Sequence, residues 1–166
     1  MNKAFETLDK SQDREGFDCG VPELNSFLRH NARQQHKIGV SRTFVLVDGG
    51  DNAPPKKISG FFTLVAAQID SSELDEQQAK RLPHNAPCLR LARLAVDKAE
   101  QGKGLGGVLL TEAILRTVAV AEEVGVSGML VEAKDGQAAA FYKKFGFVPC
   151  PSNPLRLFQA LKTLKR

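Results

Sequence analysis

The chain has 166 residues, 42% of them hydrophobic and 25% charged, and its formal net charge is +4 with a pI near 9.1. These ordinary values exclude disordered, collagen-like and disulfide-scaffold classes, and the length predicts a single domain over residues 1–166. No apolar run approaches the ~18 residues of a membrane span, and the N-terminal segment lacks the hydrophobic core of a signal peptide. We therefore expect a cytoplasmic protein without membrane contact.

The cysteines are Cys19, Cys88 and Cys150, which are far apart and form no CxxC pair. Such spacing predicts neither a disulfide framework nor a zinc site, so we expect buried or idle thiols and no metal. The basic charge favours anionic partners only slightly, because it is common among small enzymes.

Three segments have helical periodicity. The first begins with proline at residue 22, extends to residue 35 and has Leu24, Phe27, Leu28 and Asn31 on one face. The second covers residues 105–124 before Gly125, and the third covers residues 136–146 and closes on Gly146. A shorter helix is expected around residues 72–81.

Five segments are typical of strands, since β-branched and aromatic residues lie between turn signals. They cover residues 42–48, 58–70, 88–97, 128–134 and 155–161. The segment GGDNAPPKK (49–57) predicts a surface turn. Strands and helices that alternate in the second half predict an α/β fold with at least one crossover unit, and more direct strand pairing in the first half predicts a mixed sheet.

The segment QGKGLGG (101–107) has four glycines and leads directly into the second predicted helix. Its glycines satisfy GxGxxG, but a dinucleotide-binding turn leaves the first strand of its domain at once, and here several strands come first. A Walker loop needs lysine and then serine or threonine after the last glycine, where valine and leucine stand. Two interpretations remain: a phosphate or pyrophosphate site at a helix N-terminus, or a tight turn without a ligand.

The strand pattern at 88–97 changes phase near Ala92–Arg93. Leu89 and Leu91 share one face, whereas Leu94 and Val96 fall in the opposite phase. Either a β-bulge or a strand buried on both faces explains this pattern.

Two motifs resemble the GNAT N-acetyltransferases. QGKGLG (101–106), which follows RLAV and precedes an amphipathic helix, matches Q/R-x-x-G-x-G/A, the acetyl-CoA pyrophosphate loop of that family. FYKKFGF (141–147) is similar to its FYxxFGF segment. Outside residues 88–148, the segments FDCGVPELNSFLRHNARQQ, SRTFVLV, ISGFFTLVAAQ and PSNPLRLFQALKTL resemble the acetyltransferase toxins of type II toxin–antitoxin modules, which acetylate the amino group of aminoacyl-tRNA.

The resemblance implies an α/β GNAT fold, with a central mixed, mostly antiparallel sheet, a splayed strand pair and flanking helices. It also implies an acetyl-CoA-dependent N-acetyltransferase that acetylates the α-amino group of aminoacyl-tRNA and so blocks translation. The acetyl-CoA-binding residues that it implies are Leu94, Ala95, Val96, Gln101, Gly102, Lys103, Gly104, Leu105, Gly106 and Phe145. A backbone N–H near Leu94–Val96, freed by the expected bulge, would hold the oxyanion.

Tyr142 is the only tyrosine, and the resemblance makes it the general acid that protonates the coenzyme thiolate. Without the motif it reads as a half-buried helix aromatic that packs between Phe141 and Phe145. No residue is marked as a general base, although His30, His36 and Glu132 are candidates by type. An α-amine, which titrates near ~8, needs less help from a base than a lysine at ~10.4.

Basic residues gather on the first predicted helix and beside the expected catalytic centre. Arg29, Arg33, His36 and Lys37 share one helix face, with Arg42 after them, and Lys144 follows Lys143 near Tyr142. Such a face is either solvated surface or a contact with nucleic acid. With the resemblance, the candidates for tRNA contact are Arg29, Arg33, Lys37, Arg42, Arg90, Arg93 and Lys143.

The resemblance further implies an antitoxin partner, expected to be a ribbon-helix-helix DNA-binding protein, and a homodimer. Two other functions stay open on the residues. The first is a GNAT enzyme that acts on a small amine or a protein N-terminus, and the second is a non-enzymatic module that binds a coenzyme or nucleic acid.

Overall fold

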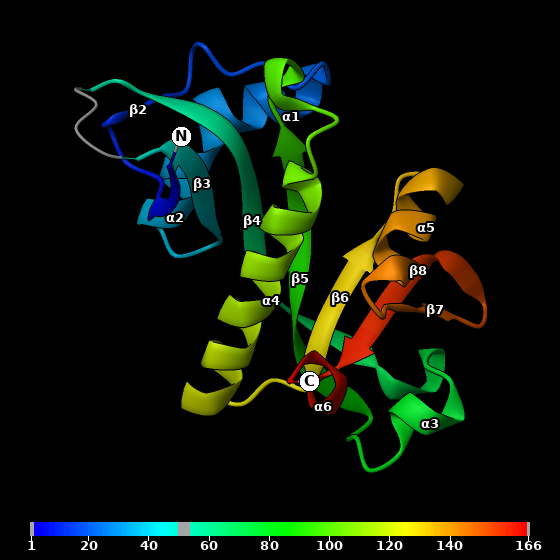
Figure 1. Cartoon of the computed structure of the whole chain (residues 1–166). Helices are drawn as coiled ribbons and strands as arrows, with labels where there is room; N and C mark the ends of the chain where they lie inside the picture. Colours follow the sequence, from blue (N-terminus) through cyan, green and yellow to red (C-terminus); the bar gives the residue numbers. More distant parts are fainter. Residues whose placement is uncertain (1, 50–53, 166) are drawn as a thin grey trace. The chain divides into compact units, whose positions relative to one another are not determined.

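The computed structural model describes residues 2–49 and 54–165 (Figure 1). These residues fall into two compact units. Unit 1 consists of the residues up to Val65 together with Arg93–Glu112. Unit 2 consists of Ala66–Ala92 together with the residues from Ala113 onward. The expected surface turn falls in part on residues 50–53, which lie outside the described residues. The single domain stays a prediction.

Unit 1 contains an antiparallel sheet in which β3 is paired on both sides. β1 pairs with one edge of β3 and β4 with the other, and the short β2 runs parallel to the start of β4. The predicted strands at 42–48 and 58–70 are confirmed, whereas β1 was not predicted because it is a five-residue edge strand without alternating apolar residues. These strands are β1 (Lys3–Thr7), β2 (Gln12–Asp13), β3 (Arg42–Asp48) and β4 (Lys56–Asp70).

The predicted first helix is a continuous helical segment with a widened turn in its middle. Its parts are α1 (Pro22–Ser26), a π-helical turn (Phe27–Asn31) and α2 (Ala32–Lys37). In the widened turn the N–H of Ala32 donates to the carbonyl of Phe27, five residues earlier. Leu28 and Ala32 are fully buried and pack with Phe61 in the core of unit 1, whereas Asn31, expected on the apolar face, is exposed.

The predicted crossover is present. Strand β6 pairs in parallel with β5 within unit 2, and α4 lies between them in sequence, with its first half in unit 1 and its second half in unit 2. β8 pairs antiparallel with β6, and β7 pairs antiparallel with β8. The elements are α4 (Leu105–Glu123), β5 (Asn85–Val96), β6 (Gly128–Glu132), β7 (Val148–Cys150) and β8 (Asn153–Ala160).

Three short helices complete unit 2. α5 (Gly136–Lys144) contacts β8, α6 (Leu161–Leu164) contacts β6 and β8, and α3 (Glu76–Ala79) occupies part of the predicted 72–81 helix. The hydrophobic core of unit 2 includes Cys88 and Cys150, and burial raises the pKa of Cys88 to about 11. The expectation of buried free thiols is therefore confirmed. Among the described helices, none is both long and apolar enough to cross a membrane.

The strand order is β1-β3-β4-β5 in unit 1 and β5-β6-β8-β7 in unit 2. Among the described residues, β2 pairs in parallel with β4 and β5 with β6, whereas β1 with β3, β3 with β4, β6 with β8 and β7 with β8 are antiparallel. This confirms a mixed, mostly antiparallel sheet. The pairing of β5 with β6 ends at Leu91 and Val131, although β5 continues to Val96, as expected for a splayed pair. Ala95 is buried, while Leu94 and Val96 are half-buried, so both faces of this strand are partly covered. The bulge stays a prediction.

We expect Gly128→Ala to destabilise the fold by about 1–3 kcal/mol, the usual cost of forcing extra volume into a packed site. A Cβ at this position would collide with the carbonyl oxygen of Gln159 and the ring of Phe158. The measurement is the free energy of unfolding in urea. Gly136→Ala is the control, because a Cβ there meets nothing within 4 Å and should leave stability nearly unchanged. Equal stability of the two variants would contradict the packing argument.

Candidate active site

The glycine turn predicted to bind a phosphate connects β5 to α4 in unit 1. Gly102 and Gly104 both have φ of +81°, a left-handed conformation that glycine adopts without steric strain. A Cβ on either residue would meet no atom within 4 Å. The two glycines are therefore required by the backbone conformation, and open space lies beside them.

The N-terminus of α4 follows this turn at Leu105 and is suited to an anion. The N–H of Val108 donates to the carbonyl of Gly104 at 3.3 Å, as one of the first bonds of the helix. The N–H groups of a helix's first turn have no intrahelical acceptor, and the helix dipole adds a partial positive charge there. Leu105 and Gly106 are half-buried in this turn, and the exposed Lys103 lies beside it. A pyrophosphate fits such an end.

Gln101 holds the turn to two other segments of unit 1. Its side-chain amide donates to the carbonyl of Val96 at 2.9 Å and to the carbonyl of Cys19 at 3.1 Å. The first acceptor lies at the end of β5 and the second in the loop before α1. This geometry explains the first position of the loop motif, because a long side chain with at least two N–H donors is needed to bridge both carbonyls.

Asp97 organises the residues just before the turn. Its buried carboxylate accepts from the N–H of Asp18 at 3.0 Å and from the N–H of Ala99 at 3.1 Å. Its own N–H donates to the carbonyl of Ser59 at 2.9 Å. Sequence reasoning missed this residue, although Asp97 followed three positions later by Glu100 is the pattern of a helix N-cap.

Glu100 lies beneath the turn in a polar network that sequence reasoning also missed. Its carboxylate accepts from the hydroxyl of Ser59 and from the ammonium of Lys3, the latter at 3.1 Å. The hydrogen bond from Ser59 lowers the pKa of Glu100, burial opposes this shift, and Lys3 adds to it. Lys3 also bonds Asp48 at 2.8 Å. The network fastens β1, β3 and β4 to the turn.

Tyr142 lies on α5 in unit 2. Its ring packs edge-on against Phe141 at 5.3 Å and Phe147 at 5.8 Å between centroids, whereas Phe145 packs on Phe141. The sequence suggested that Tyr142 packs between Phe141 and Phe145. The structure confirms Phe141 as a ring partner, but the second ring partner is Phe147. Burial raises the pKa of Tyr142, which keeps the phenol protonated and able to donate at neutral pH.

The candidate bases differ in their surroundings. Nη1 of Arg42 donates to Nε2 of His36 at 3.0 Å, and burial followed by the charge of Arg42 lowers the pKa of His36. Glu132 forms ion pairs with Arg156 at 3.3 Å and with Arg90 at 3.9 Å. His30 is exposed. Two of the three candidates thus have side chains already bonded to cationic partners.

The helix face that carries Arg29, Arg33, His36 and Lys37 is only partly available as a positive surface. The guanidinium of Arg29 donates to the carbonyls of Phe17 at 2.8 Å and Glu15 at 3.3 Å, so it holds the preceding loop. His36 is a neutral acceptor from Arg42 rather than a cation. Exposure varies among the remaining candidates: Lys37, Arg42 and Lys143 are exposed, and Arg33, Arg90 and Arg93 are half-buried.

Within the described ranges, no group of three or more His, Cys, Asp or Glu side chains is placed to hold a metal ion.

The predicted site residues divide between the two units. The glycine turn, the residues that support it and Arg93 lie in unit 1, while Arg90, Tyr142, Lys143 and Phe145 lie in unit 2.

Residues 40–149 match the family described as acetyltransferase (GNAT) domain, so the chain belongs to the GNAT acetyltransferase family and is an N-acetyltransferase. Within that family it is similar to a group of toxins. The tRNA-acetylating toxin of Mycobacterium tuberculosis is 35% identical over 155 residues, which cover 93% of this chain and 90% of that protein.

Solved structures extend this similarity to the fold. The toxin AtaT complexed with acetyl-methionyl-tRNAfMet has a TM-score of 0.90 and 31% identity, covering 99% of this chain and 98% of AtaT. A tyrosine-to-phenylalanine mutant of KacT has a TM-score of 0.89 and 32% identity, with 99% and 98% covered. A tyrosine-to-phenylalanine mutant of AtaT has been solved bound to the C-terminus of the antitoxin AtaR, and AtaTR has been solved with acetyl-CoA.

We expect acid to weaken unit 1 through Asp18. Its carboxylate accepts from the N–H of Gly20 and the amide of Asn25, and it pairs with Lys98, which together lower its pKa to about 2. Because the folded-state pKa lies below the ordinary value of 3.8, the stabilisation is complete above about pH 4 and is lost as the pH falls toward 2.

The measurement is urea unfolding of the wild type and Asp18→Asn between pH 7 and pH 2. The difference in unfolding free energy should be constant down to about pH 4 and then shrink. Glu15→Gln removes the same charge at an exposed position and serves as the control. A difference for Asp18→Asn that does not change with pH would contradict the assignment.

Proposed function

We propose that this chain transfers the acetyl group of acetyl-CoA to the α-amino group of aminoacyl-tRNA, and thereby blocks translation as the toxin of a toxin–antitoxin module. The observation that carries the proposal is the similarity over nearly the whole chain to a tRNA-acetylating toxin and to AtaT, which was solved with an acetylated aminoacyl-tRNA.

The glycine turn is the proposed site for the pyrophosphate of acetyl-CoA. Gln101 fixes its start, Gly102 and Gly104 give it an open left-handed backbone, and the first N–H groups of α4 follow. Leu94, Ala95 and Val96 at the end of β5 and Phe145 at the end of α5 complete the proposed set. AtaTR solved with acetyl-CoA supports the same donor for this chain.

The proposed chemistry requires two proton movements. The amine nitrogen attacks the thioester carbonyl, the carbon–sulfur bond breaks, the amine loses a proton and the departing thiolate gains one. Tyr142 is the proposed donor to the thiolate, since its raised pKa keeps the phenol protonated until that basic group develops. The mutants of KacT and AtaT solved with phenylalanine in place of a tyrosine support a tyrosine in this role.

The amine can reach its reactive form without a dedicated base. An α-amino group titrates near ~8, so a substantial fraction is neutral at cellular pH, whereas a lysine near ~10.4 is almost fully charged. His36 and Glu132 are occupied by cationic partners, which fits an acceptor that deprotonates by itself. Lys37, Arg42 and Lys143 supply exposed positive charge for the phosphate backbone of tRNA.

The proposal includes an antitoxin that covers the enzyme or its basic surface. A tyrosine-to-phenylalanine mutant of AtaT has been solved with the C-terminus of the antitoxin AtaR, and KacTA has been solved with DNA. By analogy, the antitoxin of this chain is proposed to be a ribbon-helix-helix DNA-binding protein, the toxin to be a homodimer, and both to act in the cytoplasm.

We expect Gly104→Ala to raise the Kd for acetyl-CoA by about 10- to 100-fold, the effect of losing one hydrogen bond to a charged group. A side chain at φ +81° strains the turn and displaces its N–H groups. The measurement is isothermal titration calorimetry with acetyl-CoA. Gly125→Ala is the matched control, because Gly125 has φ of +88° and equally open surroundings at the other end of α4. Similar losses of affinity in both variants would argue against the turn as the binding site.

We expect Tyr142→Phe to lower kcat for aminoacyl-tRNA by about 10²- to 10⁴-fold and to leave the Kd for acetyl-CoA within about twofold, since only the proton donor is lost. The measurement is transfer from radiolabelled acetyl-CoA to a pool of charged tRNA, followed by identification of the labelled amino acid. The variant should also relieve growth arrest in cells. If the wild type binds acetyl-CoA but labels no tRNA, the acceptor is a small amine or a protein N-terminus.

A further inference from the structure

A cluster of charged side chains lies beneath the glycine turn, and the chemistry proposed above does not use it. All of its members belong to unit 1, and we call them the charge cluster. Charged groups this close to an anion site change the electrostatic potential that the anion meets. The members are Lys3 at the start of β1, Asp48 at the end of β3, Ser59 on β4, Glu100 just before the turn and Lys103 within it.

The ammonium of Lys3 is fully bonded within the charge cluster. An ammonium carries three N–H donors, and that of Lys3 donates to Asp48 at 2.8 Å, to the hydroxyl of Ser59 at 2.9 Å and to Glu100 at 3.1 Å. Burial opposes the charge of Lys3, but the hydrogen bonds to Asp48 and Glu100 outweigh it and raise the pKa of Lys3. Lys3 is therefore positively charged at neutral pH.

The two carboxylate oxygens of Glu100 face different cations. Oε2 accepts from Lys3 and from the hydroxyl of Ser59, while Oε1 lies 3.7 Å from the ammonium of Lys103. That distance is too long for a hydrogen bond, and the Lys103 side chain is 63% exposed, so this ion pair is loose. Lys3 thus holds the Glu100 carboxylate closely, and Lys103 is available to a ligand in the turn.

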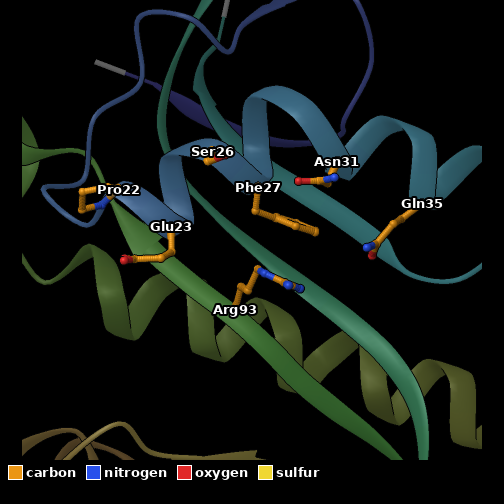
Figure 2. A pocket seen from close by; sticks show the side chains of 7 residues that line it. All are labelled: Pro22, Glu23, Ser26, Phe27, Asn31, Gln35 and Arg93. Carbon is orange, nitrogen blue, oxygen red and sulfur yellow. The ribbon is translucent and has the colours of Figure 1, made fainter.

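Two other basic side chains near the turn in sequence have partners elsewhere in unit 1. Lys98 pairs with Asp18 at 3.2 Å. Arg93 on β5 lines a pocket against the helical segment that contains α1 and α2, where its guanidinium carbon lies 3.6 Å from the centroid of the Phe27 ring (Figure 2). Among the described residues, Lys3 is therefore the cation that compensates the carboxylate beneath the turn.

An uncompensated carboxylate at this place would oppose the binding of an anion. The pyrophosphate of acetyl-CoA is negatively charged, and like charges repel more strongly in a partly buried site than in water. Without Lys3, the Glu100 carboxylate would also draw the ammonium of Lys103 to itself and away from the ligand. Both effects lower the affinity for acetyl-CoA, and both depend on the charge of Lys3.

We propose that Lys3 is a positioning residue for acetyl-CoA: its charge neutralises Glu100, so that Lys103 can turn toward the pyrophosphate in the glycine turn. The inference rests on the proposed function, because it takes this turn as the site of the pyrophosphate. It gives a role in coenzyme affinity to a residue of β1 that lies 97 positions from Glu100 in the sequence.

The test measures the Kd for acetyl-CoA by isothermal titration calorimetry in three variants. Lys3→Met should raise the Kd about 10-fold, because the Glu100 charge is then uncompensated, and Glu100→Gln should lower it about 3- to 10-fold, because that charge is removed. The double variant should bind within about twofold of the wild type. If the pair only fastened β1 to the turn, both single variants would bind more weakly, so the opposite signs distinguish a charge effect from a structural one.

Lys56 and Glu6 provide the matched control. They form a half-buried ion pair of 2.7 Å in the same unit, and their variants change the net charge in the same way. Lys56→Met and Glu6→Gln should each leave the Kd within about twofold of the wild type. Thermal unfolding without ligand checks that every variant is folded, and Lys3→Gln replaces Lys3→Met, with the same expectation, if the methionine variant does not fold.

The outcomes separate this inference from the proposed function. Any pattern other than opposite signs in the two single variants would overturn the inference and leave the proposed function in place. An unchanged Kd in Gly104→Ala would refute the turn as the binding site, and the inference with it. Opposite signs in an enzyme that labels no tRNA would support the inference and refute the proposed acceptor.

Discussion

The carboxylate of Asp97 is the constraint on which the glycine turn depends. It is buried, and it accepts backbone N–H groups from Ala99 and from Asp18, which is 79 residues away in the sequence. A buried carboxylate is costly unless such donors satisfy it, so the loop before α1 and the end of β5 must fold together. The turn and the start of α4 then take their positions from these two segments.

Periodicity predicted the long elements well where local chemistry also set their ends. The helices predicted at 105–124 and 136–146 end within two residues of the expected positions, because Gly125 and Gly146 both adopt positive φ there. β1 was not predicted because its conformation comes from pairing with β3 rather than from its own five residues. The π-helical turn was equally out of reach, since periodicity cannot distinguish it from an α-helix of the same composition.

Short motifs supplied the candidate site residues, namely the turn that starts at Gln101 and the tyrosine at 142, and the roles of both stay predictions. Contacts between segments that are distant in the sequence could not be predicted in this way. The network of Lys3, Ser59 and Glu100 joins three segments far apart in sequence, and no local pattern marks it. The positions of basic residues in the sequence predicted the free positive surface least well. The guanidinium of Arg29, for example, donates to two backbone carbonyls, and composition does not reveal such contacts.

The anchoring of the turn by Gln101 has an evolutionary consequence. Both of its acceptors are main-chain carbonyls, those of Cys19 and Val96, and every amino acid carries such a group at either position. Substitutions at positions 19 and 96 therefore leave both acceptors of the bridge in place. The bridge between the two segments therefore depends on the residue at position 101, because few side chains have both the length and the two N–H donors that it needs.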